Sequence, residues 1–426
     1  MDSHSQDILR RVEQNDDTLT ELRVGCPTGF NPSSRIDFST LGTHIREKLK
    51  VGEDFSRLGA AIGRNSNLTT LHIVFNGVVA LDVKHSAFYD GLKHNTSIHQ
   101  LNISFQNPYS TRVGGVVEAL LEAYQENSNL TELSIHNADL QNERDRLVAT
   151  TLRRCSNLKH IDLYRSNITD EQLWPMVDAI RGHRSLKVLN FCGNRIGNAG
   201  CGLLSRLLQN SNCNLHTLIL DDNSIGNDGA AALANSLSNN TKLKKLSLSG
   251  NPFESGNPFD LSVKGIFDKL LCNTSSINNI HSSNHTLTKL VLELFELPSR
   301  INQRLESLLQ LNKGANKSHV AIKKILKYHP NIDMEPFFEW NMEGDGEHDL
   351  KALPYVIAWF ERAREAVADD EGGEESFNIG ERKLSAIYQF AQAMPLLFVP
   401  DVNIISKRMT RKQRRDDMGR CACVLM

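Results

Sequence analysis

One hydrophobic pattern occurs four times in the middle of the chain, between residues 158 and 253. Each copy has leucine at its first position, leucine or isoleucine at the fourth, and leucine or phenylalanine at the sixth. The copies begin at Leu158, Leu186, Leu215 and Leu243, so they recur every 28 or 29 residues. A fixed period of this length predicts a solenoid, in which each structural unit packs only on its neighbours.

Each unit combines a strand pattern with a helix pattern. The alternation at the fourth and sixth positions is that of a β-strand, and an asparagine follows at a fixed offset, at Asn194, Asn223 and Asn251. Apolar residues at helical spacing come next, as in residues 202–208 and 230–237. We therefore predict an α/β fold with one strand and one helix per unit. The asparagines are interpreted as structural, because a side-chain amide in a turn can bond backbone groups that the sheet leaves unpaired.

The segments after the strands carry a resemblance to a known family. Asn194-Arg-Ile-Gly-Asn-Ala-Gly200 and Asn223-Ser-Ile-Gly-Asn-Asp-Gly229 resemble the leucine-rich repeats of the ribonuclease-inhibitor type. The resemblance covers over half of the chain and implies a horseshoe with parallel strands on its concave face and helices on its convex face. It implies no particular activity, because one fold can carry many functions.

The pattern changes along the chain in a way that predicts separate regions. We expect an N-terminal cap with a degenerate first repeat at residues 1–62, repeats with a terminal cap at 63–312, a helical domain at 313–400 and a basic tail at 401–426. Within these regions we expect a first strand at 19–24, a loop at 26–40, a last irregular strand at 277–280, helices at 320–328, 350–367 and 383–394, and an acidic loop at 369–375.

Composition and motifs argue against several classes of protein. The formal net charge of −2 indicates no preference for a nucleic acid or a membrane across the whole chain. No signal peptide is recognisable, and no apolar run reaches the roughly 18 residues of a membrane-spanning helix. The eight cysteines lack a metal-binding spacing and are expected to be reduced thiols of a cytoplasmic protein. Because catalytic motifs are also lacking, we expect a non-enzymatic protein without cofactor or metal.

The last four residues, Cys423-Val-Leu-Met426, match the C-a-a-X signal for prenylation, and a terminal methionine favours farnesyl. Cys421 is a candidate for palmitoylation, although a bystander cysteine is an equally good interpretation. Two acidic residues oppose seven basic ones in the approach to this signal. The basic residues are Lys407, Arg408, Arg411, Lys412, Arg414, Arg415 and Arg420. This tail resembles those of prenylated small GTPases.

The lipid signal and the basic run support each other physically. One lipid chain holds a protein to a membrane only marginally, and each basic residue near an anionic leaflet adds about 1 kcal/mol. We therefore expect attachment to an anionic cytoplasmic membrane surface. The alternatives for the basic run are a nuclear-import signal, with a nuclear location, and a nucleic-acid patch. We favour lipid anchorage and expect no nucleic-acid partner.

The side chains that alternate with the strand leucines are expected to face the concavity, where they could contact a protein. Tyr and Arg are favoured at binding hot spots, so Tyr164 and Arg165 are the candidate anchors. Ordinary solvated strand positions are an equally good interpretation of any one residue. The candidate partner-binding residues are His136, Asp162, Tyr164, Arg165, Asn190, Asp221, Asp222 and Lys245.

Three candidate functions are consistent with the sequence. The leading hypothesis is a protein-binding scaffold or adaptor tethered to a membrane by a farnesylated Cys423. The second is a regulator of a small GTPase, because Ran GTPase-activating proteins carry similar repeats, with Arg165 or Arg195 placed to stabilise phosphoryl transfer. The third is a substrate receptor of a ubiquitin ligase, although residues 1–62 show no clear F-box pattern. The partner, the membrane and the oligomeric state stay open.

Overall fold

The structure is a computed structural model. It describes residues 3–24, 35–36, 56–75, 86–105, 113–124, 129–141, 144–253, 263–292, 299–315 and 317–328. The chain divides into two compact units, Met1–Asn273 with Ser282–Lys313, and Thr274–His281 with Gly314–Met426. The first unit contains every described strand. In the second unit, helices α10 and α12 pack on each other.

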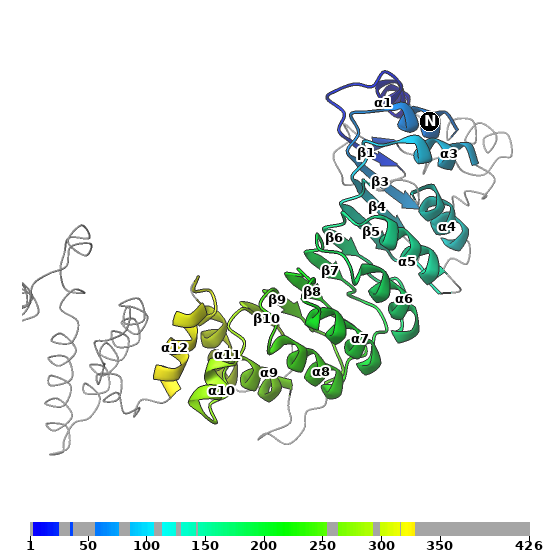
Figure 1. Cartoon of the computed structure of the whole chain (residues 1–426). Helices are drawn as coiled ribbons and strands as arrows, with labels where there is room; N and C mark the ends of the chain where they lie inside the picture. Colours follow the sequence, from blue (N-terminus) through cyan, green and yellow to red (C-terminus); the bar gives the residue numbers. More distant parts are fainter. Residues whose placement is uncertain are drawn as a thin grey trace, which may run out of the picture. The chain divides into compact units, whose positions relative to one another are not determined.

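From β3 to β10, strands and helices alternate along the first unit (Figure 1). The strands are β1 (Glu21–Val24), β2 (Arg35–Ile36), β3 (Thr70–Phe75), β4 (Gln100–Phe105), β5 (Glu132–His136), β6 (His160–Asp162), β7 (Val188–Asn190), β8 (Thr217–Ile219), β9 (Lys245–Ser247) and β10 (Lys289–Val291). Residues 56–64 are helical, and the labelled helices of both units are α1 (Ser3–Glu13), α3 (Ser86–His94), α4 (Val113–Tyr124), α5 (Arg144–Arg154), α6 (Asp170–Ile180), α7 (Asn198–Gln209), α8 (Asn227–Leu237), α9 (Val263–Leu271), α10 (Ile277–His281), α11 (Ser299–Leu311) and α12 (Lys317–Tyr328).

All the described strands form one parallel sheet, in the order β10-β9-β8-β7-β6-β5-β4-β3-β1-β2. The register keeps equivalent positions of successive repeats side by side, as in Leu133↔Ile161 and Ile161↔Leu189. Helices α3 to α9 lie along one face of this sheet (Figure 1). The prediction of an α/β leucine-rich-repeat solenoid is therefore confirmed.

The repeated leucines build the core between the sheet and the helices. Leu158, Leu186, Leu215 and Leu243 are at most 3% exposed, and the residues at the fourth and sixth positions are buried with them. A fully buried leucine contributes about 1.5–3 kcal/mol relative to an exposed one, so this periodic burial dominates the stability of the solenoid.

The three predicted structural asparagines, Asn194, Asn223 and Asn251, lie in the turns after β7, β8 and β9, and we call them the strand-exit asparagines. The Asn223 Nδ2 donates to the carbonyls of Phe191 at 2.9 Å and Leu220 at 3.1 Å. Its Oδ1 accepts the backbone N–H of Ile196 at 3.0 Å. Asn194 and Asn251 make the equivalent bonds. The interpretation of these residues as structural is confirmed.

A second set of asparagines, which sequence reasoning did not single out, precedes the strands. Asn65, Asn95, Asn240 and Asn284 each come three residues before the first apolar residue of a repeat, and we call them the strand-entry asparagines. In each, Nδ2 donates to a carbonyl of the preceding repeat and Oδ1 accepts backbone N–H groups at the start of its own strand. Cys155 and His183 occupy the same position before Leu158 and Leu186.

Two local predictions are wrong. Residues 277–280 are helical, within α10, because isoleucines three residues apart at Ile277 and Ile280 suit a helix as well as a strand. The last strand is β10, where Leu287-Thr-Lys-Leu290-Val-Leu292 repeats the strand pattern after an insertion. The predicted loop at 26–40 contains the short strand β2, whose Val24↔Ile36 pairing extends the sheet beyond β1.

Several predictions fall outside the described residues. These are the helices at 350–367 and 383–394, the acidic loop at 369–375, and the tail with Cys421, Cys423 and the seven basic residues. Residues 25–34 and 37–55, which belong to the region relevant to an F-box, also lie outside them. In the part of the chain that is described, no helix is long and apolar enough to cross a membrane.

Candidate functional site

The candidate site is the face of the sheet opposite the helices, predicted above as the concave face, which we call the open face. Its side chains alternate with the buried leucines, so most of them are half-buried. The parallel register places them in rows. One row runs through Glu132, His160, Val188, Thr217 and Lys245, and the next runs through Ser134, Asp162, Asn190, Ile219 and Ser247.

Asp162 is the centre of a polar cluster on β5, β6 and β7. The Asn190 Nδ2 donates to its Oδ1 at 3.0 Å, and the His136 Nε2 lies 3.3 Å from its Oδ2. Burial opposes ionisation of Asp162, but the proximity of His136 and the bond from Asn190 outweigh it, so the pKa of Asp162 lies below its ordinary value. Asp162 is therefore a carboxylate at neutral pH, held in place by its neighbours.

Tyr164 and Arg165 extend this cluster toward the strand-exit turns. The Tyr164 ring meets the His136 ring edge to face, with centroids 5.8 Å apart. The Arg165 guanidinium carbon lies 5.1 Å from the centroid of the Tyr164 ring, within the range of a cation–π contact. Tyr164 is half-buried and Arg165 is exposed. His136 and Arg165 thus both contact the Tyr164 ring, and Arg165 places a positive charge against it.

Asp221 and Asp222 form a second group, at the end of β8. The Asp221 Oδ2 accepts the Ser247 hydroxyl at 2.9 Å, and its Oδ1 accepts the Ser249 N–H at 2.7 Å. Asp222 is exposed. Cys192 lies between the two groups, and burial together with the charges of these aspartates raises the pKa of its thiol to about 11. A thiol with so high a pKa is a weak nucleophile at neutral pH.

Arg165 and Asp222 share an unusual backbone conformation. They have φ values of 50° and 52°, in the left-handed region that costs most residues about 1 kcal/mol or more. The equivalent positions in the alternate repeats are Gly193 and Gly250, at φ of 72° and 67°. The glycines leave room for the large neighbours, since a Cβ on Gly193 would lie 2.5 Å from the Arg165 Cγ. Two charged residues are thus held where the fold favours glycine.

The structure brings most of the predicted residues into these two groups. His136, Asp162, Asn190, Tyr164 and Arg165 form the first, and Asp221 and Asp222 form the second. Lys245 lies apart from both, at the other end of its strand, where its register neighbours are Thr217 and Lys289.

Sequence reasoning missed a further polar group on the first strands. The Arg23 and His72 nitrogens lie 2.6 and 3.2 Å from the Glu21 Oε1. Glu21 pairs in register with Thr70, so alignment of the degenerate first repeat with the later ones would have placed it on the open face.

Comparisons with known proteins agree with the fold. A family model described as "Leucine Rich repeat" matches residues 211–234 and 239–255. NACHT, LRR and PYD domains-containing protein 12 of Mus musculus is 34% identical over 129 residues, which are 30% of this chain and 12% of that protein. Ribonuclease inhibitor of Sus scrofa is 28% identical over 197 residues, 46% of this chain and 42% of that protein. The chain spans less than half the length of either relative.

Among solved structures, the actin-binding site 2 of leiomodin-1 is 20% identical, with a TM-score of 0.29. The alignment covers 42% of this chain and 89% of that one. This likeness is too small to bear on function. The repeats, the parallel sheet and the family match together identify the chain as a leucine-rich-repeat solenoid.

Proposed function

We propose that this protein is a non-enzymatic scaffold that binds another protein through the open face of its sheet. The observation that carries the proposal is the Asp162 cluster with the adjoining Tyr164 and Arg165. Cross-strand contacts fix these side chains before any partner arrives, which reduces the entropy lost on binding. The pig relative is, by its name, an inhibitor of a ribonuclease, and therefore a protein that acts on another protein.

The chemistry of the face indicates what kind of contact it makes. Tyr164 supplies a large apolar surface with a polar tip, and Arg165 adds a charge that can bond a carboxylate in two places. Asp162, Asp221 and Asp222 are carboxylates spread over β6 and β8. A partner surface that offers an acidic group opposite Arg165 and basic groups opposite the aspartates would be complementary to it.

The proposal can be tested by comparing the proteins bound by three forms of the full chain: wild type, Tyr164→Ala with Asp222→Arg, and the control Arg184→Glu. Arg184 is exposed and lies outside the open face. We expect proteins that the control retains and the open-face variant loses, with purified partner binding weakened at least about tenfold, the size of a hot-spot loss. Equal binding by all three forms would contradict the proposal.

A second proposal concerns location, and it rests on the sequence alone. Cys423 carries a farnesyl group, and the seven basic residues of the tail reinforce its hold on an anionic cytoplasmic membrane. The test is the intact mass of the C-terminal peptide from a eukaryotic cell, together with membrane fractionation of Cys423→Ser. A farnesylated, trimmed and methylated cysteine is expected. An unmodified terminus, or unchanged fractionation, would remove the proposal.

One observation keeps the GTPase-regulator hypothesis as a second candidate function. A catalytic arginine must be able to reach a bound nucleotide, and both Arg165 and Arg195 are exposed. Hydrolysis rates of a panel of small GTPases, measured with and without the protein, test it. If it is correct, one GTPase hydrolyses faster and Arg165→Ala or Arg195→Ala removes the effect. Unchanged rates across the panel would exclude this candidate.

A further inference from the structure

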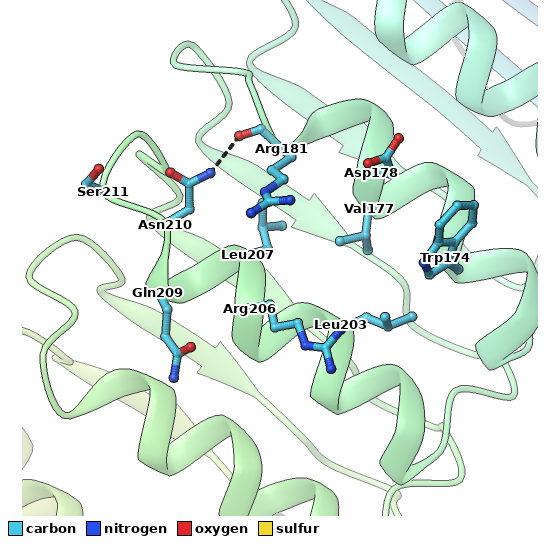
Figure 2. Close-up of a pocket in the computed structure, with 10 residues that line it drawn as sticks. All are labelled: Trp174, Val177, Asp178, Arg181, Leu203, Arg206, Leu207, Gln209, Asn210 and Ser211. Atoms are coloured by element: carbon cyan, nitrogen blue, oxygen red, sulfur yellow. Dashed lines mark hydrogen bonds between the residues drawn. The ribbon is translucent and has the colours of Figure 1, made fainter.

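A groove of about 530 Å³ lies on the helical side of the repeats, between α6 and α7 (Figure 2). Its lining residues come from both helices and from the loop that follows α7. They are Trp174, Val177, Asp178, Arg181, Leu203, Arg206, Leu207, Gln209, Asn210 and Ser211. Because the open face is on the other side of the sheet, this groove is a separate surface.

The way the helices pack explains why a groove opens here. Helix α6 packs closely on α5, and α7 packs closely on α8, whereas α6 and α7 share fewer contacts. Residues such as Gly229 and Ala230 on α8 allow the close approach of α7 and α8. The Asn210 amide donates to the Arg181 carbonyl at 3.0 Å, and this bond fixes the loop that forms one end of the groove (Figure 2).

Trp174 is the one large hydrophobic side chain that is exposed within the described residues, and 60% of it is accessible. Its exposure follows from its place on α6, since the buried stripe of the helix runs through Leu173, Met176, Val177 and Ile180. Val177 and Leu207 are buried beneath the groove and give it an apolar floor. An exposed indole beside an apolar groove is a contact site for an apolar side chain.

The charges around the groove are unbalanced. Asp178 lies 3.2 Å from the Arg153 guanidinium, so its charge is already compensated. Arg181 and Arg206 are both exposed, and their side chains make no ion pair with any residue that the structure describes. Two guanidinium groups therefore line the groove without an ion-pair partner among the described residues. Arginine pairs favourably with carboxylates in a bidentate geometry.

We propose that this groove binds an acidic peptide segment, in which an aromatic or large aliphatic side chain lies next to Asp or Glu. The apolar side chain packs against Trp174 over the Val177 and Leu207 floor, and the carboxylates pair with Arg181 and Arg206. The apolar floor favours a peptide over a nucleic acid, which presents phosphates along its whole length.

The probe is a library of random peptides displayed on phage, selected against the full wild-type chain after depletion on a Trp174→Ala, Arg206→Glu variant. We expect enriched peptides to carry Asp or Glu beside an apolar residue. A synthetic peptide from this set should bind about tenfold more weakly to Trp174→Ala and to Arg181→Glu. The control Arg184→Glu removes an exposed arginine outside the groove and should leave affinity unchanged.

Three results would overturn the proposal. The first is the absence of enriched peptides, or the enrichment of peptides without acidic residues. The second is binding of a single-stranded oligonucleotide that competes with the peptide and depends on the same three groove residues. The third is a dimer of the chain that Trp174→Ala dissociates, because a second copy would then occupy the groove. Far-ultraviolet circular dichroism of each variant distinguishes lost binding from lost folding.

Discussion

The two ends of the strands use the same chemistry but differ in how completely the repeats keep it. The strand-exit asparagines are present in the repeats with strands β7, β8 and β9, whereas Ala138 and Ser166 stand at the same position after β5 and β6. The strand-entry asparagines are present at Asn65, Asn95, Asn240 and Asn284, but Cys155 and His183 replace them before β6 and β7. Each end of the strands therefore keeps its amide in some repeats and has another residue in others.

This difference teaches where the solenoid has lost stability. A buried side-chain amide that bonds two or three backbone groups also keeps those groups from being unpaired. Each unpaired group would cost about 1–3 kcal/mol of stability. His183 replaces this amide incompletely, because neither buried ring nitrogen makes a well-formed hydrogen bond, although the Leu152 carbonyl lies close enough to raise the pKa of the ring. His183 also lies two residues after Arg181, which lines the groove between α6 and α7. We infer that the strand-exit asparagines hold the turns after β7, β8 and β9 in place.

The largest effect is expected at a strand-exit turn. Asn223→Ala leaves the carbonyls of Phe191 and Leu220 and the N–H of Ile196 without their partner, so unfolding should become easier by about 3 kcal/mol. Chemical denaturation measures the change. Asn239→Ala, at an exposed asparagine, is the matched control and should stay within about 0.5 kcal/mol of wild type. A small effect of Asn223→Ala would remove the distinction between the two ends of the strands.

A second, smaller loss is expected at Gly193. Gly193→Ala requires alanine at a φ of 72° and places a Cβ against the Arg165 side chain, at a combined cost of about 2 kcal/mol. Combining it with Arg165→Gly should recover the part due to the clash and leave only the backbone part. A double-mutant cycle by chemical denaturation separates the two. Simple additivity of the two changes would show that Arg165 does not depend on this glycine.

Restoring a strand-entry asparagine should stabilise the chain. The amides of Asn95 and Asn240 bond the strand-entry turns at the equivalent positions of their repeats. His183→Asn should supply the same bonds and raise the free energy of unfolding by about 1 kcal/mol.

The substitution also changes the dependence on pH. Burial lowers the pKa of His183 below its ordinary value of 6.5, despite the nearby Leu152 carbonyl. The unfolded chain then binds the extra proton, so this destabilisation is absent above pH 6.5 and grows as the pH falls through that value. Denaturation midpoints are measured above and below pH 6.5. The difference between the two midpoints should be smaller for His183→Asn than for wild type. An unchanged difference would indicate that another group, such as the half-buried His72, dominates.

The smallest effect on stability is expected at the left-handed charged residues. Arg165→Gly and Asp222→Gly place glycine where the alternate repeats already have it, so stability should rise by up to about 1 kcal/mol. Binding of the partner should weaken in both variants. Denaturation and affinity are measured on the same preparations. A gain in stability without a loss of binding would show that these residues are not retained for recognition.

The fold was predictable because two features define the repeat. They are the regular spacing of Leu158, Leu186, Leu215 and Leu243 and the asparagines that follow the strands. The repeat period did not predict β10, because an insertion shifts the strand pattern to Leu287. Ile277 and Ile280 matched the spacing of a strand but lie in helix α10. The open-face residues were predictable from alternation alone. The bonds among them were not, because they depend on side-chain conformations across strands. The groove was missed because its opening depends on how α6 and α7 pack on each other.

The central claim is that the open face contacts a protein, and site-specific photo-cross-linking tests it most directly. A photoreactive amino acid replaces Tyr164 in the full chain in cells, and Arg184 in the control. We predict that position 164 cross-links a defined protein, that position 184 does not, and that Asp222→Arg in the same chain removes the product. Capture of the same protein with equal yield from both positions, or no capture from position 164, would contradict it.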